Sequence, residues 1–179
     1  MINRIKVNLE SVEAMLYFWQ AVNERENLSE VYIYDVAAMP SFKISYDNEF
    51  NEESVRRALS AIKNREVFSR NNQKEGRFYN NNLWMMEDLS YTGMMIAPIK
   101  KLNLDSLLEE LNAKCPNAKY EELDVLFSPL HVDEYFIKDD KLVINFFKVK
   151  PDLEVGLTLI GEVEVKRYIL EKLEELLNV

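Results

Sequence analysis

Apolar residues recur along four stretches of the chain at the spacing of one helix face, namely i, i+3, i+4 and i+7. These stretches cover residues 8–23, 51–64, 103–115 and 162–177, and each is predicted to be an amphipathic helix. Local chemistry supports two of the ends, because Asn51 is a suitable N-cap and Pro116 disfavours helical backbone at the residue before it. Residues 83–89 fit either a short helix or a strand, and we favour the helix.

Other stretches are rich in β-branched and aromatic residues, which favour extended backbone. They predict strands over residues 31–36, 42–46, 94–97, 120–127, 132–137, 142–149 and 155–160. The last four strands are joined by short loops, including residues 138–141 and 150–152, and short loops require antiparallel pairing. These four strands are therefore expected to form a meander.

The order of the elements lacks a strict alternation of strand and helix. The predicted fold class is α+β, with a mainly antiparallel sheet, a C-terminal β-meander of about four strands, and helices packed on one face. No linker or internal repeat divides the 179 residues, and this length fits a single domain. Residues 65–82 are the most polar stretch and are predicted to be a mobile, asparagine-rich loop of the kind that carries function.

The formal net charge of −9 changes the picture of possible partners. It disfavours duplex nucleic acid, because Lys and Arg supply most of the affinity for phosphate. Residues 65–77 hold the best candidate for a local basic patch. A net negative charge of this size favours solubility. The alternative interpretation is that the chain binds a basic partner protein.

Cellular location is inferred from what the N-terminal residues lack. They contain no apolar segment with a small-residue cleavage site, and no apolar run approaches the roughly 18 residues that span a bilayer. Cys115 is the single cysteine, so no disulfide forms within the chain. We therefore predict a cytoplasmic protein without a membrane partner.

The sequence lacks the residues that several common catalytic mechanisms require. The four glycines form neither a phosphate-binding loop nor a dinucleotide fingerprint, and no Gly-x-Ser-x-Gly elbow occurs. One histidine and one cysteine are too few for a zinc site, which takes about four ligands. We therefore expect no cofactor and no metal centre.

Three residues are nevertheless weak candidates for catalysis. His131 and Asp133 share one face of a predicted strand, where the carboxylate could orient the imidazole as a general base. The alternative is an ordinary histidine that follows a turn. Asp35 is a single acid within an apolar predicted strand, and a buried carboxylate has to be paired or functional. A nucleophilic pair of Cys115 and His131 is also conceivable.

The candidate binding surface lies further along the chain, beside the predicted loop. Its weak candidates are Arg77, Trp84, Met85 and Tyr91, since aromatic and methionine side chains are favoured at interfaces, although they also occur in ordinary cores.

The favoured function is a non-catalytic intracellular binding protein. One subclass is an inhibitor or immunity protein for a basic partner, and a homodimer is a further candidate. The alternatives are a carboxylate-using hydrolase or metal-dependent enzyme, and a small-molecule sensor.

Overall fold

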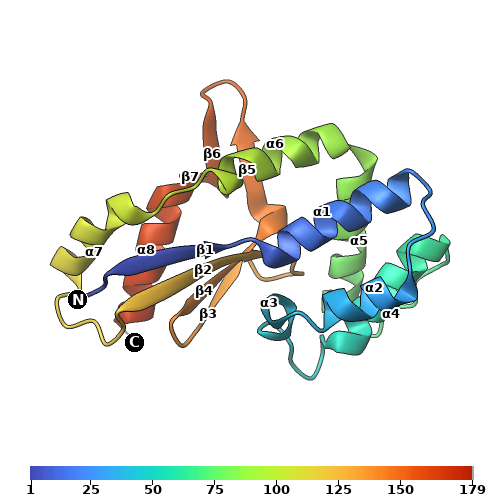
Figure 1. Ribbon diagram of the computed structural model, residues 1–179, viewed down its shortest axis with the longest axis horizontal. Coiled ribbons are helices and arrows are strands. Elements are labelled where there is room, and N and C mark those ends of the chain that lie inside the picture. The colour runs from blue at the N-terminus through green and yellow to red at the C-terminus, as the bar shows by residue number, and fades with distance from the viewer. Residues whose placement is uncertain (179) are drawn as a thin grey trace. The chain divides into compact units, whose positions relative to one another are not determined.

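The computed structural model describes residues 1–178 and has an α+β fold in which seven strands form two sheets. Within the described residues there are also eight α-helices and two short 3-10 helices (Figure 1). The chain divides into two compact units, which we name the sheet unit and the helix unit. The sheet unit comprises Met1–Leu9, Gly93–Phe127 and the chain from Glu134 onward, and the helix unit comprises Glu10–Thr92 and Ser128–Asp133. A single domain over all 179 residues stays a prediction.

The helix unit consists of five helices and the first turn of a sixth. They are α1 (Glu10–Asn23), α2 (Glu30–Ala37), α3 (Pro40–Lys43), α4 (Glu52–Asn64), α5 (Gln73–Glu87) and the start of α6 (Leu89–Lys100). The largest members of their common core are aromatic, and Phe18, Trp19, Phe42, Phe50 and Phe78 are fully buried. The indole N–H of Trp19 donates to the side-chain oxygen of Asn82 over 2.9 Å, which satisfies a polar group inside this core.

The sheet unit is built around a mixed four-stranded sheet with the strand order β1-β2-β4-β3. Its members are β1 (Arg4–Asn8), β2 (Glu122–Ser128), β3 (Tyr135–Lys138) and β4 (Lys141–Asn145). Strands β1 and β2 run parallel, with Ile5 opposite Leu123 and Val7 opposite Val125, whereas β3 and β4 are antiparallel. Parallel strands need a long connection, and here residues 9–121 supply it.

A second, antiparallel sheet completes the sheet unit together with its helices. It has the order β5-β6-β7, from β5 (Val149–Asp152), β6 (Leu157–Ile160) and β7 (Val163–Glu164). The helices are the second part of α6, the 3-10 helix Asp105–Leu107, α7 (Leu108–Lys114), the 3-10 helix Phe146–Lys148 and α8 (Val165–Leu177). Helix α8 contacts β4, β6 and β7. That the helices cover only one sheet face stays a prediction.

The helices with the clearest apolar period are confirmed as α1, α4 and α8. Asn51 caps α4 as predicted, because its side-chain oxygen accepts the Ser54 N–H over 3.1 Å in a capping box. Glu164 caps α8 in a similar way, through the Arg167 N–H at 3.1 Å. The helix predicted from residue 103 begins as a 3-10 turn and continues as α7, which ends at Lys114 before Pro116.

The two strands predicted over residues 31–36 and 42–46 are wrong, since these segments belong to α2 and to α3 with its following turn. Ser29 caps α2 by accepting the Val31 N–H over 3.1 Å. The buried residues Ile33, Val36 and Ala37 then fall on one helix face. Helix period and capping thus outweigh the β-branched and aromatic composition that favoured a strand.

The predicted loop over residues 65–82 is also largely helical, because α5 begins at Gln73. Asn72 caps α5 through the Glu75 N–H at 2.9 Å, and Asn82 is buried against Trp19. The strand predicted over residues 94–97 lies within α6. The Asp88 carboxylate caps the start of α6 by accepting the Tyr91 N–H over 2.9 Å. Pro98 lies close to the C-terminal end of α6, where it is tolerated.

The predicted four-stranded C-terminal meander is wrong in its connectivity. The strands that follow residue 120 are divided between two sheets, and the 3-10 helix Phe146–Lys148 interrupts the predicted strand 142–149. The hairpin turn at 138–141 is confirmed, with Asp139 at a φ of 55°. The turn predicted at 150–152 instead follows Asp152. Pro151 lies in β5, which is tolerated because β5 is an edge strand.

Candidate functional site

His131 lies in the core of the helix unit, where its ring meets Phe50 edge-on at a centroid distance of 4.7 Å. The Val132 N–H donates to Nδ1 over 2.9 Å, so the neutral ring carries its proton on Nε2. Burial lowers the pKa of His131, and Lys74 adds to this effect against the opposing charges of Asp133 and Asp47. Asp133 itself is exposed. This is the environment of a core histidine with charged groups near it.

Asp35 lies on the exposed side of α2, between the buried residues Ile33 and Val36. The argument that singled it out required a buried carboxylate in a strand, and neither condition holds. Within residues 1–178, no group of three or more His, Cys, Asp or Glu side chains is arranged to hold a metal ion. The catalytic candidates therefore gain no support from the geometry.

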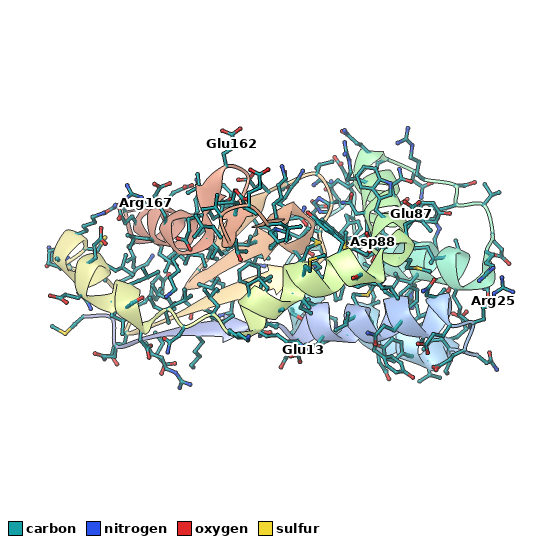
Figure 2. All side chains as sticks on the ribbon, turned by 90° about the horizontal axis from the view of Figure 1, so that it is seen from above. Glu13, Arg25, Glu87, Asp88, Glu162 and Arg167 are labelled. Carbon is teal, nitrogen blue, oxygen red and sulfur yellow. The ribbon has the colours of Figure 1, made fainter. Side chains whose placement is uncertain are left out.

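The four binding candidates differ in exposure. Trp84 is 62% exposed and Tyr91 is 36% exposed, on α5 and α6 respectively, and Arg77 is also exposed. Helix α5 ends at Glu87, and Asp88 caps α6; both residues lie between Trp84 and Tyr91 in the sequence and are labelled in Figure 2. Met85 is buried, and its backbone oxygen accepts the Thr92 hydroxyl over 2.9 Å. Met85 is thus available for packing, not for contact with a partner.

A polar pocket of about 150 Å³ lies between the starts of α4 and α5. Glu75 is the buried carboxylate in its lining, with only 3% of the residue exposed. Its oxygens accept hydrogen bonds from Ser54 Oγ (2.6 Å), Arg57 Nη1 (3.1 Å) and the Asn71 N–H (2.9 Å). Because these groups satisfy one another, the cluster joins two helices, and the Glu75 charge is already paired.

The open side of β1 presents a different situation, since β1 is the last strand of its sheet. One side of β1 pairs with β2, and no strand among the described residues pairs with the other side. An unpaired strand edge presents a row of N–H and C=O groups that a further strand can use. The segment that connects α6 to α7 runs beside this edge (Figure 1).

Hydrogen bonds around β1 identify which residues face outward. The Asn3 N–H donates to the Glu121 carbonyl on the β2 side over 2.7 Å. The neighbouring Ile2 bonds on the other side to the Asn112 side chain, which accepts its N–H and donates to its C=O, both at 2.8 Å. The Asp124 N–H donates to the Asp140 carbonyl on the β4 side over 3.0 Å, so Glu122 and Asp124 face β4. Their register partners Arg4 and Lys6 therefore bond to β2, and the N–H and C=O groups of Ile5 and Val7 point outward.

The outward edge of β1 borders a groove of about 530 Å³. Its lining comprises Arg4, Ile5, Lys6, Val7, Leu9, Ile99, Lys100, Leu102, Asn103, Leu104 and Asp105. Three of these side chains are cationic and one is anionic, whereas the whole chain carries a net charge of −9. Lys6 forms an ion pair with Glu122, so Arg4 and Lys100 contribute the charge that is available to a ligand.

Reasoning from the sequence missed this site because it predicted no strand before residue 31. The pattern that would have found β1 is the alternation of Arg4, Ile5, Lys6, Val7 and Asn8, polar and apolar by turns. That β1 occupies a sheet edge, and that Asn112 approaches it, depends on contacts between distant parts of the sequence.

Comparison of the chain with protein-family models, with curated protein sequences and with solved structures finds no match. The candidate site therefore depends on its own geometry. No helix among residues 1–178 is long and apolar enough to cross a membrane.

Proposed function

We propose that this protein is a non-catalytic interaction protein that binds an extended segment of a partner protein as an additional strand on β1. The observation that carries the proposal is the outward edge of β1, where Ile5 and Val7 present backbone groups to a groove. Strand addition of this kind is a common way for a domain to hold a peptide, with affinity from main-chain hydrogen bonds.

The amide of Asn112 supports the proposal from within the chain. It bonds to both backbone groups of Ile2, as a peptide group in a paired strand would. The register with β2 makes Ile5 and Val7 the next two positions at which an incoming backbone would pair. Helix α7 carries Asn112 and so closes one end of the edge, which leaves the open part beside the groove.

The expected affinity is modest. Ile5 and Val7 offer two donors and two acceptors, and each hydrogen bond contributes about 0.5–1.5 kcal/mol, or roughly 2–6 kcal/mol in all. Ordering the peptide offsets part of this gain. A short peptide should therefore bind with a dissociation constant from high micromolar to millimolar, and a natural partner would need additional contacts.

NMR titration with a capped heptapeptide of alternating valine and threonine tests the proposal. We expect the amide resonances of Ile5 and Val7 to shift and their hydrogen exchange to slow as the peptide is added. The amides of Arg4 and Lys6 already face β2, so their protection should change little.

Val7→Pro removes one outward N–H while leaving the bonds to β2, because proline is accepted at an edge strand when its nitrogen faces outward. Val7→Ala is the matched control that keeps the N–H. Binding should fall several-fold in Val7→Pro relative to Val7→Ala, with Lys6 protection verifying that β1 remains paired. Equal binding by the two variants, or no shift at Ile5 and Val7 in the wild type, would contradict strand addition.

The other functions suggested by the sequence stay predictions: a basic partner, homodimerisation, a carboxylate-using or metal-dependent enzyme, and a small-molecule sensor. Catalysis has the least support, because Asp35 is exposed whereas His131 is buried. Cytoplasmic location also stays a prediction.

A further inference from the structure

We infer that the groove beside β1 selects extended segments in which acidic and apolar residues alternate. This inference rests on the proposed strand addition and specifies the chemistry of the partner. It follows from the charges of the groove and from the two faces of β1.

The two faces of β1 differ in chemistry. Arg4 and Lys6 are two residues apart and share one face of the sheet, and Ile5 and Val7 share the other. A strand added beside β1 would place alternate side chains next to each pair. Opposite charges across a strand pair are favourable, and like charges are unfavourable. Acidic residues therefore suit the Arg4 face, and apolar residues suit the Ile5 face.

The far wall of the groove has the same two properties. Lys100 adds a cation, and apolar side chains come from Ile99, Leu102 and Leu104. Asp105 is the anionic residue in the lining. A segment with acidic residues near Arg4 and Lys100, and without them near Asp105, would complement this distribution.

A second copy of the chain is a poorer occupant of this edge. Pairing of two β1 strands would bring Arg4 and Lys6 of one copy close to the same cations of the other, which is unfavourable. Lysine on an edge strand is a known means of opposing such pairing between identical sheets.

Single-stranded nucleic acid is also a poorer occupant. Proteins that bind single strands combine cations with aromatic side chains on which bases stack. The lining of this groove contains no aromatic residue. The charge and the apolar wall together thus favour an acidic peptide.

Three capped heptapeptides serve as probes, in which valine alternates with glutamate, glutamine or lysine. NMR titrations of the full chain at low salt should give binding of the glutamate peptide roughly tenfold tighter than of the lysine peptide, with the glutamine peptide between them. Raising the salt concentration should reduce this difference, because exposed charges are screened.

The double variant Arg4→Gln with Lys100→Gln should lose the preference and keep binding of the glutamine peptide. Lys138→Gln, on β3 at the opposite edge of the same sheet, is the matched control and should keep the preference. Retention of the preference in the double variant would overturn the inference.

The outcomes separate the inference from the proposed function. If the three peptides bind equally and still shift the Ile5 and Val7 amides, strand addition holds and acidic selectivity is wrong. If no peptide shifts these amides, both are wrong. Tighter binding of a single-stranded oligonucleotide at the same residues would also overturn the inference.

Discussion

The cluster around Glu75 gives the most exact prediction of stability. The Glu75 side chain, on α5, accepts hydrogen bonds from Ser54, Arg57 and Asn71. It thereby joins α5 to α4 and to the segment before α5. Arg57 is in turn held by the Ser69 carbonyl, to which it donates over 2.6 Å. The perturbation is Glu75→Ala, with Glu75→Gln as the variant that keeps the shape and removes the charge.

The magnitude follows from burial. Removing one partner of a buried ion pair costs about 3–5 kcal/mol, because the remaining charge is left without compensation. The Arg57 side chain is 32% exposed, so water can hydrate part of its charge when the carboxylate is gone. We therefore expect Glu75→Ala to lower the free energy of unfolding by about 3 kcal/mol, near the lower limit. Glu75→Gln should cost about 2 kcal/mol, since three charge-assisted bonds become neutral or are lost.

Lowering the pH should reproduce part of this loss in the free energy of unfolding. Burial by itself would raise the pKa of Glu75, but hydrogen bonds from Ser54, Asn71 and Arg57 outweigh it and hold the pKa below its ordinary value of 4.5. The unfolded chain therefore takes up the proton first as the pH falls. The contribution of Glu75 is complete above pH 4.5 and is lost as the pH falls through the lower pKa of the folded state.

Urea denaturation of the wild type and both variants, at pH 7 and at several values below 4.5, measures these effects. Arg57→Ala and the double variant complete a cycle that isolates the pair, with an expected coupling of about 1–2 kcal/mol. Arg77→Ala, at an exposed position of α5, serves as a control near zero, within about 0.5 kcal/mol. A loss below about 1 kcal/mol in Glu75→Ala would refute the reasoning that this carboxylate joins the helices.

Three further predictions concern the helix unit. Asn82→Leu removes the acceptor of the buried Trp19 indole N–H and should cost about 2 kcal/mol in urea denaturation; a neutral result would show that the bond contributes nothing net. Burial lowers the pKa of His131, so the folded state binds its proton less readily than the unfolded state. Stability should fall as the pH drops below the ordinary value of 6.5, and His131→Gln should flatten this dependence below pH 6.5; an unchanged slope would contradict the assignment. Trp84→Ala, on the surface, should change stability by less than about 0.5 kcal/mol, whereas Met85→Ala, in the core, should cost about 2 kcal/mol or more, and thermal unfolding distinguishes the two.

The helices α4 and α8 could be predicted because the information for them is local. An apolar stripe at helical spacing and a capping residue such as Asn51 act within a few positions of each other. The strand predicted over residues 31–36 was wrong although local information was available, since Ser29 is a capping residue and the buried positions follow helical spacing. Composition received more weight there than periodicity.

Helix α5 shows where local information ends. Asparagine is a poor helix former, so residues 71–82 resembled a loop. In the folded chain, Asn82 is buried and bonded to Trp19, which lies far away in the sequence. Tertiary contact therefore overrides the local preference of these residues.

The sequence by itself determined the α+β class, the amphipathic helices, the hairpin at 138–141 and the acidity of the chain, because each depends on neighbouring residues or on composition. The tertiary structure alone decided the mixed sheet and the burial of His131. It also decided the open edge of β1 beside a basic groove. That edge depends on the pairing of β1 with β2 across residues 9–121 and on the approach of Asn112, and no local pattern encodes contacts over such a separation.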